Sequence, residues 1–267
     1  MNAAIFFHAG LLGYTVAAAL FLAFLVVPTE GRARWGYRSL LAGFLFHAGA
    51  VGLRVIEYAQ GGGFRLGEGL SYVAFLVVGI YLLFGRFYRI PTVGAFVAPL
   101  MVGALLAYHV VPGAQSVGRG PVEGMLLPFH IGVAVGGLAL FSLGFVVALM
   151  YLLLERELKA KRLGAMFRKL PPLGLLDLLN YQLVLLGFLL LTFTIGTGAF
   201  FSVGENGFFF SLRSKEGFAL VAWLLTFVVV LLRQTVGWRG KRVAWATMVG
   251  FLLLSFAFVG IFVGEGA

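Results

Sequence analysis

The stretch Leu126–Leu154 reads LLPFHIGVAVGGLALFSLGFVVALMYLLL and contains no Asp, Glu, Lys or Arg. An α-helix rises about 1.5 Å per residue, so about 20 apolar residues cross the hydrocarbon core of a bilayer. The apolar run is continuous rather than alternating, which favours a helix over a barrel strand. The stretch therefore predicts a transmembrane helix, and its one histidine is His130.

The same pattern recurs along the whole chain. Hydrophobic residues make up 61% of the 267 residues and charged residues 11%, against roughly 25% charged residues in a soluble domain. This composition excludes a water-soluble fold. We expect an all-α integral membrane protein, a bundle of about eight transmembrane helices in a single domain, 1–267. The predicted spans are Ala3–Val27, Trp35–Tyr58, Gly67–Phe84, Pro91–Val111, Leu126–Leu154, Leu176–Phe201, Gly217–Leu232 and Trp245–Val263.

The basic residues predict the orientation of these spans. Alternate connections hold fifteen Lys and Arg residues on one side and five on the other. Because the richer side faces the cytoplasm, we expect both termini on the outer, extracytoplasmic side. The first segment has no basic stretch before it and no small-residue cleavage pattern, so we interpret it as a retained helix. The predicted location is a bacterial plasma (inner) membrane, crossed many times.

The net charge of +10 does not indicate nucleic-acid binding, because the basic residues lie in short loops between apolar runs. Cysteine is absent, so thiol chemistry and disulfides are excluded. A redox reaction would therefore need a bound cofactor. We expect the basic connection 155–174 to lie along the lipid headgroups and to fix the orientation of the neighbouring helices. The alternative is that it binds a partner protein.

The four histidines all fall inside predicted spans, where ionisable groups are costly and are functional candidates. With both termini outside, His8, His109 and His130 lie near the outer ends of their helices. His47 lies about eleven residues from the outer end of its helix, near mid-membrane. Histidine is the usual axial ligand of haem b, and facing histidines at one depth suit such a cofactor. The alternative is that each histidine hydrogen-bonds across helices.

Arg54 comes seven residues, or about two helical turns, after His47. Its side chain therefore lies on the same face of the helix as His47, about 10 Å nearer the outside. This offset resembles the span from a haem iron to its propionates. Glu57, three residues on, explains Arg54 equally well as an ion-pair partner. Other metal chemistry is disfavoured because the sequence has no His-x-x-x-His pair and no carboxylate pair inside a span. Ion or solute transport is a weaker hypothesis, since paired intramembrane charges are scarce.

From about Leu126 to Gly260 the chain resembles the cytochrome c assembly proteins of the CcsA, CcmC and HemX type, a group of membrane haem handlers. Phe129-His130-Ile131 resembles the family's Leu-His-Val, whose histidine is an external haem ligand. The stretch 176–198 resembles its L-D-x-L-x-Y-R, G-F and L-T-x-G-x-x-x-G signature. Lys215-Glu216 and the stretch 237–241, GWRGK, resemble later family motifs.

The family's tryptophan-rich W-G-x-x-W-x-W-D segment has no equivalent here. The chain reads FSVGENGFFFSLRS at 201–214, without tryptophan or aspartate, and Leu231 stands where the family has a histidine. The family's last external histidine also has no counterpart. These departures make the chain most similar to the HemX-like branch, which the resemblance connects with haem biosynthesis or haem homeostasis rather than with haem ligation to cytochrome c.

We therefore expect a haem-binding membrane protein that handles haem in cytochrome c biogenesis or haem homeostasis. The candidate ligands of haem b, bis-histidine in kind, are His130, His8, His109 and His47. Arg54, Arg65 and Arg119 are candidate propionate partners, because the guanidinium fork suits carboxylates. We expect no enzyme activity, with transmembrane electron transfer through haem left open. The alternative is a non-catalytic regulator or assembly factor that acts on a haem-biosynthesis enzyme or a cytochrome c assembly protein through its basic cytoplasmic loop.

Overall fold

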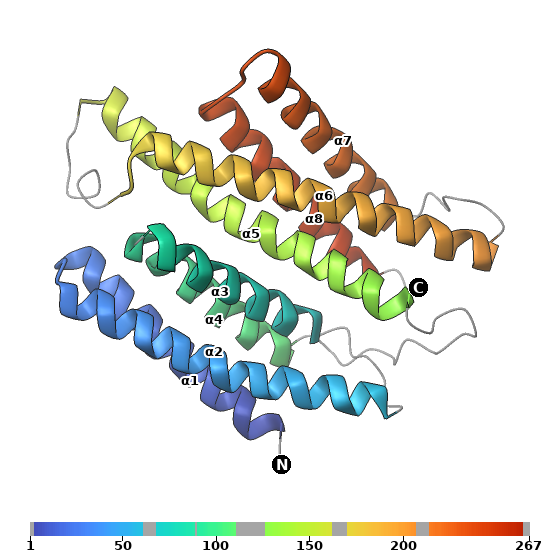
Figure 1. Ribbon diagram of the computed structural model, residues 1–267, viewed down its shortest axis with the longest axis horizontal. Helices are drawn as coiled ribbons and strands as arrows, with labels where there is room; N and C mark the ends of the chain where they lie inside the picture. The colour runs from blue at the N-terminus through green and yellow to red at the C-terminus, as the bar shows by residue number, and fades with distance from the viewer. Residues whose placement is uncertain are drawn as a thin grey trace. The chain divides into compact units, whose positions relative to one another are not determined.

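In the computed structural model, residues 3–60, 68–88, 90–110, 126–161, 170–206 and 214–263 are described. Over these residues every element is an α-helix, and all eight helices are long and apolar enough to cross a membrane. The predicted all-helical, multi-pass fold is confirmed (Figure 1). The helices are α1 (Ala3–Val26), α2 (Glu30–Ala59), α3 (Glu68–Tyr88), α4 (Pro91–Val110), α5 (Leu126–Lys159), α6 (Leu173–Asn206), α7 (Ser214–Thr235) and α8 (Lys241–Val263).

Several helices run beyond the apolar spans that the sequence predicts. Helix α2 begins at Glu30, because Thr29 caps it by accepting a hydrogen bond from the backbone N–H of Arg32 at 3.4 Å. Helix α5 continues to Lys159, where Lys159 donates to Glu155 at 2.7 Å. A cap and a pair of opposite charges one turn apart stabilise a helix end that is made of polar residues. The helices therefore extend beyond the apolar residues that would lie in lipid.

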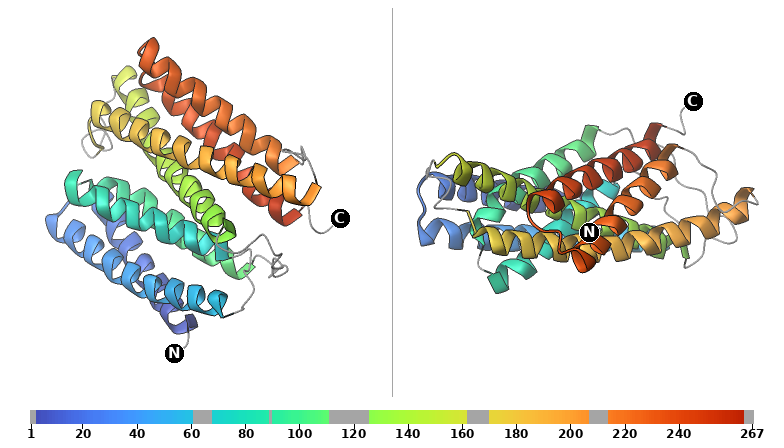
Figure 2. Two further views of the ribbon diagram at one scale, coloured as in Figure 1. Left: turned by 45° about the vertical axis from the view of Figure 1, so that its right-hand side comes forward. Right: turned by 90° about the horizontal axis from the view of Figure 1, so that it is seen from above.

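The chain forms two compact units, and each is described by itself. Helices α1 to α4 belong to the first unit, and helices α5 to α8 belong to the second. In the first unit α1 packs against α2 and α4, and α3 packs against both α2 and α4. In the second unit α5 packs against α6 and α8, and α7 packs against α6 and α8. Figure 2 gives two further views of each group of helices.

Glycine allows a close approach of α1 to α2 in the first unit. A Cβ atom built on Gly13 would lie 2.5 Å from Cα of Gly43, and one on Gly43 would lie 2.8 Å from Cδ1 of Tyr14. Neither position has room for a larger side chain, because part of the obstacle is backbone. In a bilayer the lipid tails are as apolar as the helix side chains, so the hydrophobic effect does not drive helices together. Close packing of small residues drives their association instead.

An ion pair fixes the α7–α8 turn of the second unit to α6. Arg233 donates from both terminal nitrogens to the carboxylate of Asp177, at 3.1 and 2.9 Å. The backbone N–H of Gly240 donates to the same carboxylate at 2.7 Å. Gly240 has a φ of +70°, which only glycine adopts without strain, and its missing side chain leaves room for the Tyr151 hydroxyl. The family-like residues Asp177 and Gly240 thus hold three helices at one end.

Candidate functional site

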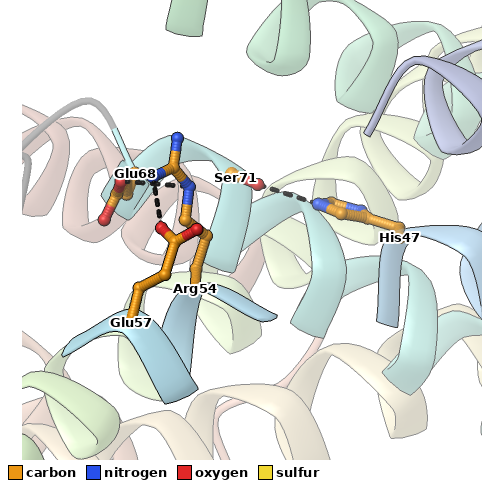
Figure 3. Close-up of polar contacts among 5 residues, drawn as sticks. All are labelled: His47, Arg54, Glu57, Glu68 and Ser71. Atoms are coloured by element: carbon orange, nitrogen blue, oxygen red, sulfur yellow. Dashed lines mark hydrogen bonds and ion pairs between the residues drawn. The ribbon is translucent and has the colours of Figure 1, made fainter. Parts of the chain in front are cut away.

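His47 lies in the core of the first unit and is fully buried. Its Nδ1 is 3.1 Å from the hydroxyl of Tyr14 on α1, and its Nε2 is 2.8 Å from the hydroxyl of Ser71 on α3. Both ring nitrogens are therefore bonded to side chains of neighbouring helices, as Figure 3 shows for Ser71. A metal ligand needs a nitrogen lone pair turned toward the metal, and in this arrangement His47 has none to offer.

His8 and His109 lie together at one end of the first unit. Their rings, from α1 and α4, have centroids 5.6 Å apart and planes inclined by 28°. Phe7 lies beside both histidines, with its centroid 5.7 Å from the ring of His8 and 5.4 Å from that of His109. Tyr108 packs on Phe7 at 4.9 Å. The structure thus brings two of the predicted ligands into one aromatic cluster.

The side chain of His8 has a defined tautomer. Its Nδ1 lies 2.6 Å from the backbone carbonyl of Ala4, one turn earlier on α1. A carbonyl oxygen only accepts, so Nδ1 carries the proton and a neutral ring has its lone pair on Nε2. Backbone acceptors orient metal-bound histidines in the same way. His8 therefore fits a role as an axial ligand through Nε2.

His130 lies in the second unit, on the first turns of α5. Its Nδ1 is 2.7 Å from the hydroxyl oxygen of Thr197 on α6. The Thr197 hydroxyl also lies 2.8 Å from the carbonyl of Phe193 and 3.1 Å from that of Thr194, and either carbonyl can accept its proton. When the proton is directed to one of these carbonyls, the oxygen of Thr197 accepts from Nδ1–H of His130, and a neutral ring has its lone pair on Nε2. A Cβ on Gly198 would lie 3.4 Å from Cε1 of His130, so this glycine lets the ring lie close to α6.

Arg54 is held between two carboxylates in the first unit. Its Nη1 donates to Glu57 at 2.7 Å, and its Nε lies 3.6 Å from Glu68 of α3. The ion pair with Glu57, one of the two sequence-based interpretations, is present (Figure 3). The side chain of Glu68 is only 8% exposed, while that of Glu57 is 53% exposed. Arg54 therefore already has acidic partners without a ligand.

The remaining predicted site residues, Arg65 and Arg119, lie outside the described residues. Residues 162–169 of the basic connection 155–174, the predicted anchor or docking loop, do so too. Sequence reasoning missed the partners Tyr14, Ser71 and Thr197. Thr197 lies in the stretch Gly196-Thr197-Gly198, whose small residues are a signal for close helix packing but not for a histidine partner.

These features define a multi-pass helical membrane protein whose four histidines lie near helix ends and in a helical core. The family model of the cytochrome c assembly protein matches residues 62–266, which is most of the chain. The protein therefore belongs to the cytochrome c assembly protein family, and the predicted family resemblance is confirmed at this level.

Individual relatives are distant. The chain is 27% identical over 225 residues to the cytochrome c biogenesis protein CcsA of Chlamydomonas reinhardtii, covering 80% of this chain but only 63% of that protein. It is 27% identical over 255 residues to the inner membrane protein YpjD of Escherichia coli K12, covering 94% of both chains. CcsA of Synechococcus sp. CC9605 is also 27% identical, over 91% of this chain and 88% of that protein.

Proposed function

We propose that this protein binds haem b in the membrane and acts in haem handling, in cytochrome c biogenesis or haem homeostasis. The observation that carries the proposal is the hydrogen bond of His8 Nδ1 to the carbonyl of Ala4, next to the ring of His109. A neutral His8 ring that donates from Nδ1 has its lone pair on Nε2, as an axial ligand requires. Membership of the cytochrome c assembly family supports the same chemistry.

His8 and His109 would hold haem in the first unit, and His130 would hold haem in the second. When bound, haem supplies an iron that changes oxidation state. The chain's own residues orient it: Ala4 and Thr197 fix the rings of His8 and His130, and Phe7 and Tyr108 offer aromatic surface beside His109. His47 does not fit this role in the structure, because Tyr14 and Ser71 occupy both of its nitrogens.

The finer assignment is the HemX-like branch, because tryptophan is missing from residues 201–214. Near full-length similarity to an E. coli protein named for the inner membrane supports a bacterial plasma membrane location. We further propose that both termini lie outside, which places the outer ends of α1, α4 and α5 on the extracytoplasmic side. The protein would then be a haem-binding protein rather than an enzyme.

A haem titration tests the proposal. The chain is purified in mild detergent, haem is added, and the Soret absorbance is followed for the wild type and for His8→Ala, His109→Ala, His130→Ala and His47→Ala. We expect saturable binding that weakens by about tenfold or more when a ligand is removed. His47→Ala should retain the haem spectrum. Binding that is unchanged in the His8, His109 and His130 variants would overturn the ligand assignment.

A further inference from the structure

The ion pairs of Arg54 have a consequence for the proposed function, on which this inference rests. Arg54, Glu57 and Glu68 together carry one positive and two negative charges when ionised. A porphyrin carboxylate that approaches Arg54 therefore meets a guanidinium that is already more than neutralised. Arginine binds carboxylates best through two parallel N–H bonds, so a ligand carboxylate needs donors that Glu57 now holds.

The two glutamates differ in how firmly they are placed. Glu68 is on α3, its side chain is 8% exposed, and it lies 3.6 Å from Nε of Arg54. Glu57 is three residues from Arg54 on the same helix, and its side chain is 53% exposed at 2.7 Å from Nη1. An exposed pair on one helix contributes little, whereas a buried carboxylate cannot leave its partner cheaply. Glu57 is therefore the carboxylate that can be displaced.

The guanidinium lies near the aromatic end of the first unit. Arg54 lies seven residues, about 10 Å, beyond His47 on α2. The ring of His47 is 6.1 Å from that of Phe7, which is 5.4 Å from that of His109. Figure 3 shows Arg54 and its two glutamates on the side of Ser71 away from His47. A porphyrin held near His109 thus has Arg54 within the same part of the unit.

We propose that Glu57 occupies Arg54 as an internal carboxylate and exchanges with a carboxylate of the bound porphyrin, while Glu68 keeps the guanidinium in place. Glu57 is then a specificity-determining residue. It disfavours anionic ligands that cannot replace it with a well-placed carboxylate, and it keeps Arg54 paired in lipid when no ligand is present.

The test compares two porphyrins that differ only in these carboxylates. Haem and haem dimethyl ester are titrated separately into the full chain in detergent. Glu57→Gln keeps the size of the side chain but removes its charge, and we expect it to bind haem up to about fivefold tighter. Arg54→Gln should bind haem about tenfold more weakly. Neither change should alter the affinity for the ester.

Glu155→Gln is the matched control, because Glu155 also pairs within its own helix, with Lys159 at 2.7 Å, but in the second unit. It should leave both affinities unchanged. The proposed exchange is wrong if Glu57→Gln leaves the affinity for haem unchanged or lowers it. It is also wrong if Glu57→Gln raises the affinities for haem and for haem dimethyl ester equally. In these cases the proposed function still stands. If the wild type binds neither porphyrin, the proposed function fails and the exchange fails with it.

Discussion

Single hydrogen bonds decide which histidines can act as ligands. Nδ1 of His8 donates to the carbonyl of Ala4, so a neutral ring has its lone pair on Nε2, whereas Ser71 and Tyr14 bond both nitrogens of His47. The sequence sets His47 apart from the other three histidines by its depth, but it does not show the side-chain partners Tyr14, Ser71 and Thr197. These partners lie 24 to 67 residues away along the chain, so the sequence gives no local signal for them.

Removing the acceptor beside His130 should weaken haem binding. Thr197→Val keeps the shape of the side chain but loses the oxygen that orients the ring, and we expect about a tenfold loss of affinity for haem. Thr194→Val is the control, because the Thr194 hydroxyl donates to the carbonyl of Leu190. A titration monitored by Soret absorbance measures both variants. Equal affinities for Thr197→Val and the wild type would show that this hydrogen bond does not orient a ligand.

Replacing His47 should reduce stability rather than cofactor content. His47→Ala leaves the hydroxyls of Tyr14 and Ser71 without their partner in a buried core and opens a cavity, so we expect a loss of about 3 kcal/mol. Ser71→Ala removes one of the two hydrogen bonds and should cost about 1 kcal/mol. Reversible unfolding in mixed micelles measures both. An unchanged stability in His47→Ala would contradict the structural role.

At the scale of helices, the existence of all eight was predictable and their ends were not. Continuous apolar runs predict spans because lipid requires each backbone group to be bonded within its own segment. The ends depend on local caps and charged turns outside lipid, as at Thr29 of α2 and Lys159 of α5. Which helix faces touch depends on packing, so the approach of Gly13 to Gly43 was not predicted from the sequence.

Because α1 packs closely on α2, the loss of stability on replacing a glycine of α2 should depend strongly on its position. Gly43→Leu would meet the Tyr14 ring and the backbone of α1, and we expect a loss of at least about 2 kcal/mol. Gly52→Ala on the same helix is the control, because nothing lies within 4 Å of the added carbon, and it should be neutral or slightly stabilising. Thermal unfolding in detergent compares the two variants. Similar melting temperatures would contradict the packing at Gly43.

At the scale of the whole molecule, the distribution of basic residues predicts orientation. Fifteen Lys and Arg residues lie on the predicted cytoplasmic side and five on the other, and with eight predicted crossings we expect both termini on the same, outer side. Reporter enzymes that are active only outside the cytoplasm, fused to either terminus, should both be active. A matched fusion in the basic loop after Lys159 should be inactive. The reverse pattern would invert the topology.

Haem carried on the histidines of this membrane protein is the proposal on which the others depend. The most direct measurement is a reduced-minus-oxidised absorption spectrum of the chain purified in mild detergent, before and after haem is supplied. We expect a b-type spectrum with a sharp α band, diminished in His8→Ala and His130→Ala. A protein that stays colourless after haem is supplied would contradict the claim.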